Sequence, residues 1–288
     1  MSVPSLALSP LAATPVPAAL QAIAPAAATP ERPSAPRASV RVRAHAFDLD
    51  GNVFGPGFPT KIILFKKGGN QELAVPTAHF AALESKVGTD YVYGGANLRD
   101  YELRGAQSFR NFFGPQFVID LQYAVVNLPP SEWQGPSWDA FVRSLSDPRL
   151  AEQVYVLTAR QHSSEDILEG FKYLQAAGYI KFLPKVGNLH GVGGTYRTAE
   201  RKAELMIKFL DALQSSPIGA ENGPHTMGFS DDTWTNYEKM RGTLIALLKS
   251  QPGRWSTVKI SLFYTGTNDI AHRPEAIVLN DDGTTRPR

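Results

Sequence analysis

The amino-acid sequence predicts an α/β protein with a doubly wound, mostly parallel sheet. Two observations predict this fold class. In the second half of the chain, short apolar runs alternate with amphipathic segments of helical period, which is typical of parallel strands joined by crossover helices. Acidic and hydroxyl side chains also stand directly after several of the apolar runs. Ligands of such sheets bind beyond the carboxyl ends of the strands, so these polar residues are candidates for a functional site.

The first strands of the expected sheet are short, and one amphipathic helix connects two of them. The first strand spans residues 40–47, and a second run rich in β-branched and aromatic residues spans 154–157. An amphipathic helix is expected over 164–177, closed by Gly178 as is common at helix ends. Residues 182–189 are expected to form a further strand.

The C-terminal third continues the alternation of helix and strand. The segment 198–213 carries Leu205, Phe209 and Leu213 at a spacing of four, which predicts one apolar helix face. The remaining elements, in order, are a strand at 226–229, a helix at 237–249 and a strand at 258–264.

A long segment separates the first two strands. Asp48 and Thr158 lie 110 residues apart, far more than a crossover connection needs. We therefore expect a cap-like insert over about 57–150, which would shield a site from water and select its substrate. Within it, the sequence predicts a hairpin that pairs 91–93 with 101–103 around Gly94-Gly95, and helices near 76–87 and 137–146.

The N-terminal segment has a different composition. Its first forty residues contain 12 Ala and 8 Pro, which offer little apolar area and interrupt both helix and strand. Residues 1–41 are therefore expected to be a disordered tail, with 42–288 forming the folded domain. The first basic residue is Arg32, and prolines interrupt the early apolar stretch, so no clear signal peptide is present and the compartment, cytoplasm or cell envelope, stays open.

Bulk composition excludes several classes of function. The formal net charge is +2, which gives no electrostatic sign of nucleic-acid binding. The chain has no cysteine, so disulfides, thiolate metal sites and cysteine nucleophiles are excluded. No apolar run approaches the length of a membrane span. The sequence leaves the oligomeric state open.

The residues that could carry chemistry cluster at the ends of predicted strands. They are Asp48 and Asp50 after the first strand, Thr158 after the second, Asp231 and Asp232 after the third, and Lys202 early in the helix that precedes the third. This set, in this order, resembles the four signature motifs of the haloacid dehalogenase-like superfamily. The motifs are Asp-x-Asp after the first strand, Thr or Ser after the second, a Lys, and an acidic pair.

The resemblance implies a phosphate-ester hydrolase that depends on Mg²⁺. By the family's pattern, Asp48, the backbone carbonyl of Asp50 and Asp231 would hold the metal, with Asp232 supporting it. Asp48 would be the nucleophile and would form an aspartyl-phosphate. Asp50 would act as general acid and base. The two remaining residues, Thr158 and Lys202, would hold the phosphoryl oxygens.

Each of these motifs also has a simpler structural interpretation. A calcium loop beginning at Asp48 would need Gly at its sixth position and Glu at its twelfth, where Val53 and Pro59 stand. A plain turn at Asp48, a strand-ending Thr158 and a helix-capping role for the acidic pair are structural alternatives. Lys185 and Lys208 are alternatives to Lys202. His162 is interpreted as a surface-loop histidine.

One position departs from the pattern of many phosphatases in the superfamily, which have Thr four residues after the nucleophile. Asn52 stands there, at a position that shapes the loop more than it carries chemistry. Members that dehalogenate generally lack the second aspartate, so Asp50 favours phosphate chemistry. The expected partner is a small-molecule phosphate ester of unknown identity. A non-catalytic metal- or phosphate-binding module and a phosphotransferase are the alternative functions.

Overall fold

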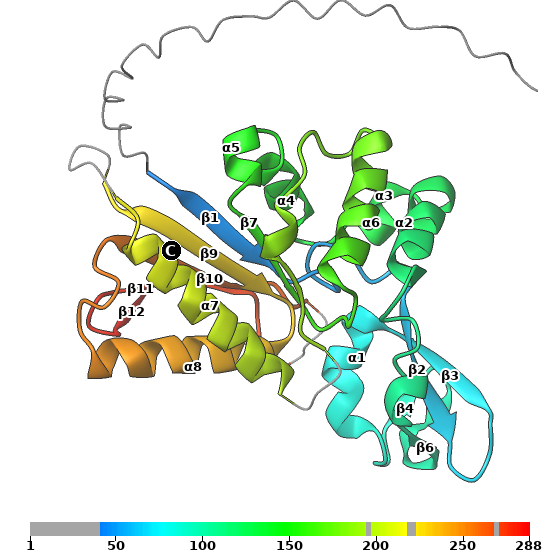
Figure 1. The fold of residues 1–288 in the computed structure, drawn as a ribbon. Helices are drawn as coiled ribbons and strands as arrows, with labels where there is room; N and C mark the ends of the chain where they lie inside the picture. The colour runs from blue at the N-terminus through cyan, green and yellow to red at the C-terminus, as the bar shows by residue number, and fades with distance from the viewer. Residues whose placement is uncertain (1–40, 194–196, 218–222, 268–270) are drawn as a thin grey trace, which may run out of the picture. The chain divides into compact units, whose positions relative to one another are not determined.

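A seven-stranded sheet forms the centre of the protein, seen here in a computed structural model (Figure 1). The structure describes residues 41–193, 197–217, 223–267 and 271–288, so the predicted tail lies almost entirely outside the described residues. The sheet has the order β12-β11-β10-β9-β1-β7-β8. Its strands are β1 (Arg43–Phe47), β7 (Val154–Thr158), β8 (Leu189–Gly191), β9 (His225–Asp231), β10 (Val258–Tyr264), β11 (Glu275–Leu279) and β12 (Thr285–Pro287).

Five strands of this sheet are parallel. β1 lies between β7 and β9, with Phe47 opposite Val156 on one side and Ser230 on the other. β8 and β10 extend the parallel part outward, and β11 and β12 are antiparallel to their neighbours. The chain thus moves from β1 outward to β8 and returns to β9 on the opposite side of β1. The prediction of a mixed α/β protein with a mostly parallel sheet is confirmed.

Helices cover both faces of the sheet. They are α2 (Gln116–Asn127), α3 (Pro130–Trp133), α4 (Trp138–Ser144), α5 (Pro148–Ala151), α6 (Ser164–Ala176), α7 (Thr198–Gln214) and α8 (Trp234–Ser250). Successive side chains of a strand point to opposite faces. In β1, Ala44 and Ala46 face the cluster formed with α7 and α8, while Phe47 faces the cluster formed with α2, α4 and α6.

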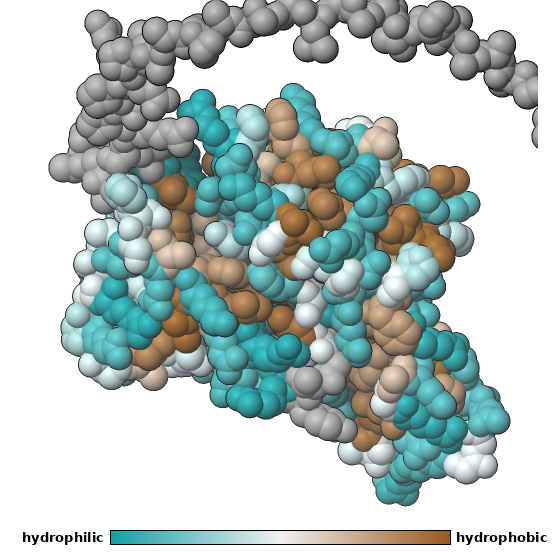
Figure 2. All heavy atoms as spheres, in the orientation of Figure 1, coloured by the Kyte–Doolittle hydropathy of each residue, from teal (hydrophilic) through white to brown (hydrophobic). Residues whose placement is uncertain are grey.

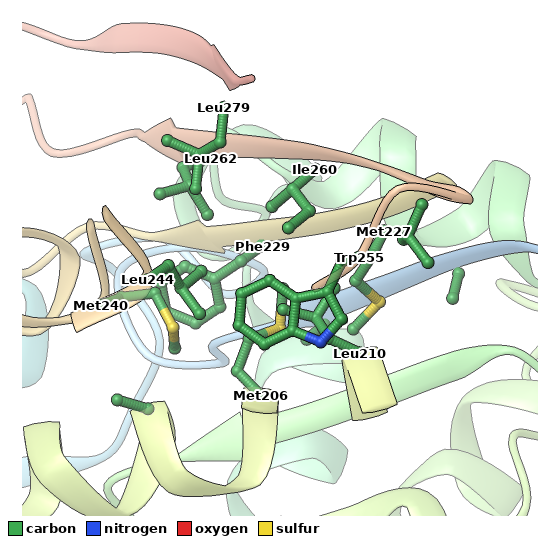
Figure 3. Close-up of a cluster of buried hydrophobic side chains, with 14 of the residues drawn as sticks. Met206, Leu210, Met227, Phe229, Met240, Leu244, Trp255, Ile260, Leu262 and Leu279 are labelled. Atoms are coloured by element: carbon green, nitrogen blue, oxygen red, sulfur yellow. The ribbon is translucent and has the colours of Figure 1, made fainter. Parts of the chain in front are cut away.

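The cluster under α7 and α8 is drawn in Figure 3. Met206 and Leu210 of α7 meet the strand residues Met227 and Phe229, and Trp255 closes the layer. All five side chains are 1% exposed or less, so each contributes about 1.5–3 kcal/mol of transfer free energy. The helix predicted over 198–213 is confirmed as α7, but its fully buried apolar residues are Ala203, Met206, Leu210 and Leu213. Of the predicted apolar stripe only Leu213 is among them, while Leu205 and Phe209 are partly buried.

Part of the long segment after β1 forms a small module with its own core. Its elements are β2 (Lys61–Lys66), β3 (Glu72–Pro76), α1 (Thr77–Leu83), β4 (Val92–Tyr93), β5 (Ala96–Asn97) and β6 (Tyr101–Glu102), with 3-10 helices at Glu84–Lys86, Leu98–Asp100 and Gly105–Gln107. Their apolar side chains pack together around Leu64, Val75 and Leu98. Asn111 Nδ2 donates to Lys61 O at 3.5 Å, so the two ends of this module, residues 61–112, meet.

The rest of that segment belongs to the sheet core. Phe117, Trp133 and Phe141 are fully buried in the same cluster as Phe47 and Val156. The helices α2 to α5 therefore cover one face of the sheet. Within the segment 57–150, residues 61–112 are the part whose hydrophobic core is separate from the sheet core. Whether these residues select substrate stays a prediction.

Two expected elements were wrong. Gly94-Gly95 does turn a hairpin, but it joins β4 to β5, while Tyr101 and Glu102 pair with β2 instead. Residues 182–189 were expected to be a strand, but the chain there includes a 3-10 helix, Val186–Asn188, and the strand β8 starts only at Leu189. The two antiparallel strands β11 and β12 were not predicted.

The surface is mixed. Figure 2 shows hydrophobic residues among hydrophilic ones on the side of α2 and α6, and the exposed apolar side chains of α2 include Ile119, Tyr123 and Val126. Within the described ranges, no helix has the length and apolar character to cross a bilayer.

Candidate active site

Asp48 lies immediately beyond the carboxyl end of β1. The strand places it there because its backbone N–H donates to Ser230 O at 3.0 Å, which continues the pairing of β1 with β9. The residue is 4% exposed. Lys202 Nζ donates to Asp48 Oδ1 at 2.8 Å and to Asp231 Oδ2 at 2.7 Å. One buried ammonium thus joins the ends of two neighbouring strands.

Lys202 is the lysine that reaches this point. It lies in the second turn of α7 and is fully buried. Burial alone would lower the pKa of its ammonium, but Asp231 and Asp48 together raise that pKa above its ordinary value. Lys185 pairs with Glu152 at the exposed surface, and Lys208 lies beside β8. The structure therefore brings Lys202, and neither alternative, to Asp48.

Three aspartates converge around this lysine. Carboxylate oxygens of Asp48, Asp231 and Asp232 lie within 4.8 Å of one another. Among the described residues, this is the one group of three or more His, Asp or Glu side chains close enough together to hold a metal ion. Asp231 Oδ1 accepts from Thr233 N at 2.9 Å and from Asn236 Nδ2 at 3.3 Å. Asp232 Oδ1 is buried without a hydrogen-bond partner.

The charges of this cluster do not balance. Burial raises the pKa of Asp48 to about 7, with Lys202 opposing and Asp231 adding to the effect. Burial, with Asp48 and Asp231, raises the pKa of Asp232 well above its usual range. One ammonium faces three carboxylates, and one carboxylate oxygen has no donor. Hard carboxylate oxygens in this number fit a divalent cation such as Mg²⁺.

Gly51 brings the loop after β1 against this cluster. Its φ is +79°, a conformation that side-chain-bearing residues rarely adopt. A Cβ atom at this position would overlap the Asp232 carboxylate. Glycine is thus required both by the turn and by the close approach of the backbone to Asp232.

Thr158 stands on the same edge of the sheet. Because Phe47 is opposite Val156, the last residue of β7 lies level with the first residues after β1. Thr158 is fully buried, and its Oγ1 accepts from Arg160 N at 3.3 Å. The structure thus gathers Asp48, Asp231, Asp232 and Lys202 in direct contact or within reach, and places Thr158 at the adjacent strand end.

Asp50 is held by a residue that sequence reasoning missed. Arg160 donates to Asp50 from Nε at 2.8 Å and from Nη2 at 2.6 Å. The arginine is fully buried, and the Asp50 side chain is 11% exposed. The only available signal was the place of Arg160 in the sequence, two residues after Thr158, and a single arginine there carries no pattern.

Asn52 organises the loop. Its Nδ2 donates to Asp48 O, Ser230 O and Ser230 Oγ, each at 3.0 Å. Its Oδ1 accepts from Ser137 Oγ at 2.6 Å and from Thr265 Oγ1 at 2.8 Å. The side chain is fully buried. Asn52 thus fixes the loop that carries the two aspartates without contributing a reacting group.

The expectation that His162 lies in a surface loop was wrong. The residue is 2% exposed, and its ring lies 5.8 Å from the ring of Phe117. Neither ring nitrogen has a hydrogen-bond partner. Burial, with the charge of Arg160, lowers the pKa of His162 to about 4, so the ring is neutral near pH 7.

A cavity of about 370 Å³ lies beside β8, separate from the aspartate cluster. Its lining includes His190, Arg201 and Lys208, but none of the aspartates. It therefore stands apart from the groups assembled around Asp48.

Comparison of the chain with protein-family models, curated proteins and solved structures gave no match.

Proposed function

We propose that this protein is a Mg²⁺-dependent phosphate-ester hydrolase whose nucleophile is Asp48. The observation that carries the proposal is the contact between Asp48 and Lys202 at the carboxyl end of the central strand, with Asp231 sharing the same ammonium. This is where doubly wound sheets bind their ligands. The resemblance to haloacid dehalogenase-like enzymes gives each of these residues a role.

The charge of the site favours an anionic substrate only when a cation is present. A phosphate monoester is repelled by Asp48, Asp231 and Asp232 unless positive charge is supplied. Lys202 supplies one charge. Bound Mg²⁺ would neutralise charge on the carboxylates and on the phosphoryl group. The residues that would hold it are Asp48, Asp231 and Asp232, with the backbone carbonyl of Asp50.

The reaction would proceed in two displacements. A carboxylate oxygen of Asp48 forms a bond to phosphorus while the bond from phosphorus to the ester oxygen breaks, and Asp50 gives a proton to that leaving oxygen. Asp50 then takes a proton from water as the water oxygen attacks phosphorus and Asp48 leaves. Lys202 and the Thr158 hydroxyl hold phosphoryl oxygens in both steps.

Two aspartates separated by one residue favour a catalytic role over the non-catalytic alternative. A module that only binds metal or phosphate needs no proton-transferring carboxylate beside Asp48. A phosphotransferase would use the same residues and pass the group to an acceptor alcohol. The small module, residues 61–112, would select the leaving group as a cap does.

Turnover of a panel of phosphate esters with and without Mg²⁺ tests the proposal. Phosphate release is expected with Mg²⁺ and is expected to stop with excess EDTA. Acceptor-dependent products in the presence of alcohols would identify a phosphotransferase. Binding of Mg²⁺ or phosphate with no turnover of any ester would favour the non-catalytic alternative.

A further inference from the structure

We infer that Arg160 is a positioning residue that fixes the Asp50 carboxylate and links it to the base of the small module. This inference rests on the proposed function, in which Asp50 transfers the proton of the leaving group. Arg160 donates hydrogen bonds to Asp50, Thr60 and Thr158, and none of the three clustered aspartates is among these partners. Its effect on the reaction is therefore exerted through Asp50.

The guanidinium fixes Asp50 in one orientation. Two parallel donors, Nε and Nη2, meet the two carboxylate oxygens at 2.8 and 2.6 Å. This fork-to-fork pairing sets both the position and the plane of the carboxylate. Lysine could not reproduce it, because an ammonium is a point charge without the planar fork.

The same guanidinium reaches the entry to the small module. Arg160 Nη2 also donates to Thr60 Oγ1 at 2.7 Å, and Thr60 immediately precedes β2. The Thr60 hydroxyl in turn donates to Asp120 of α2, whose other oxygen accepts from Gln116 Nε2 at 2.7 Å. Thr60 is fully buried and Asp120 is 5% exposed. Through Arg160, this chain of contacts connects Asp50 to Thr60, the residue that immediately precedes the small module.

The last residue of the module, Phe112, also lies beside Arg160. Gln161, which directly follows Arg160 in the chain, donates from its backbone N to Phe112 O at 2.8 Å. The Arg160 guanidinium lies 5.4 Å from the Phe112 ring, 5.6 Å from the Phe58 ring and 4.9 Å from the Phe117 ring. Its Nη1 is buried without a hydrogen-bond partner, so these aromatic faces are its surroundings.

Both ends of the module therefore converge on the group that orients Asp50. A shift of the small module that displaced Thr60 or Phe112 would also displace the Arg160 guanidinium, and with it the Asp50 carboxylate. In this arrangement the segment proposed to select the leaving group is mechanically connected to the residue that protonates it. Misplacement of a catalytic group by about 1 Å can cost on the order of 100-fold in rate.

Two aryl esters that differ in leaving-group basicity test the role of Arg160. Phenyl phosphate needs protonation of its leaving oxygen more than 4-nitrophenyl phosphate does. Arg160→Lys is expected to lower kcat/KM for phenyl phosphate by about 10-fold or more, and for 4-nitrophenyl phosphate by much less. The ratio of the two values does not depend on the fraction of folded protein. Arg254→Lys, which also breaks a two-pronged pair with an aspartate beside an aromatic ring, should leave the ratio unchanged.

The link to the module is tested at Thr60. Thr60→Val keeps the shape but removes the hydroxyl, and it should shift the same ratio in the same direction, while Thr60→Ser should restore it. If Arg160→Lys does not fold, the Thr60 pair carries the test. In an Asp50→Asn background, Arg160→Lys should cause no further shift in the ratio, because both changes act on one step.

The outcomes separate this inference from the proposed function. If the wild type cleaves neither ester with Mg²⁺, the proposed function is overturned and the inference with it. If the wild type is active and Asp50→Asn shifts the ratio, but Arg160→Lys and Thr60→Val do not, only the inference is overturned. Faster cleavage of phenyl phosphate by Arg160→Lys would also overturn it, by showing that the pair restrains Asp50 instead of positioning it.

Discussion

Asn52 Oδ1 accepts a hydrogen bond from Thr265 Oγ1 at 2.8 Å and so joins the loop after β1 to the loop after β10. The same oxygen accepts from Ser137 Oγ. Asn52→Ala would leave several buried donors and acceptors without partners, each costing about 1–3 kcal/mol. We expect a loss of about 3 kcal/mol or more in the free energy of unfolding, measured by urea denaturation.

An exposed asparagine provides the control for this experiment. Asn127 also donates to a backbone carbonyl, that of Tyr123, but it does so at the surface. Asn127→Ala should change stability by less than about 1 kcal/mol. Equal losses in the two variants would show that the Asn52 contacts do not hold the loop.

Asp48→Asn should abolish turnover while the fold is kept. An amide cannot attack phosphorus, and it removes one negative charge from a cluster with more carboxylates than cations. Steady-state phosphate release and the melting temperature are the measurements. Substantial activity in folded Asp48→Asn protein would remove the nucleophile assignment.

Asp50→Asn should instead slow turnover and cause phosphorylated Asp48 to accumulate, which intact-mass spectrometry would detect.

Mg²⁺ should stabilise the wild type and have much less effect on Asp232→Asn. The buried Asp232 has an oxygen without a donor, and its pKa is raised well above the usual range by burial and by the other two aspartates. Removing its charge should stabilise the metal-free protein and weaken Mg²⁺ binding. Thermal melting at increasing Mg²⁺ concentration measures both effects, with the exposed Asp281→Asn as control. An identical Mg²⁺ response in the two variants would contradict a metal role for Asp232.

His162→Leu should make stability less sensitive to acid. The folded protein holds the pKa of His162 at about 4, below its ordinary value of 6.5, so the unfolded chain binds the extra proton between these values. Stability from the neutral ring is therefore present above pH 6.5 and is lost as pH falls towards 4. Urea denaturation at pH 7 and pH 5 should show the variant gaining about 1–2 kcal/mol relative to the wild type at the lower pH. A difference that does not change with pH would refute this.

Removal of the small module should leave the sheet domain folded. Its ends meet at Lys61 and Asn111, so a short Gly/Ser linker can replace residues 62–110. A larger replacement, of 60–148, should unfold the protein because it removes Trp133 and Phe141 from the sheet core. Generic aryl phosphates should still be cleaved by the shorter deletion, with altered preference among esters. Unchanged preference would show that the module does not select substrate.

The sheet and the cluster around Asp48 could be predicted because their signals are local. Short apolar runs mark β7 and β10, helical periodicity marks α6 and α7, and carboxylates directly after strands mark the site. Position relative to a strand end then decides which side chains meet. Asp48, Asp231 and Lys202 meet for this reason, although they are far apart in the chain.

What could not be predicted depends on contacts between distant segments. A two-residue strand such as β6 has no detectable period, so its pairing with β2 instead of the nearby β4 is invisible in the sequence. The burial of His162 depends on Phe117, and the role of Arg160 depends on Thr60 and the surrounding rings. Nothing in a single side chain's neighbours along the chain reveals these partners.

The position of β1 in the middle of the sheet also sets the order in which the protein can assemble. β1 leaves the ribosome before both of its partners, which lie on segments translated much later, and Lys202 follows Asp48 by 154 residues. Contacts between residues this far apart in the sequence make folding slow compared with domains whose contacts are mostly local. The hairpin of β2 and β3 can form without any later segment of the chain, because its two strands are consecutive in the sequence. During synthesis the strands β2 and β3 can therefore pair while the Asp48 carboxylate still faces water.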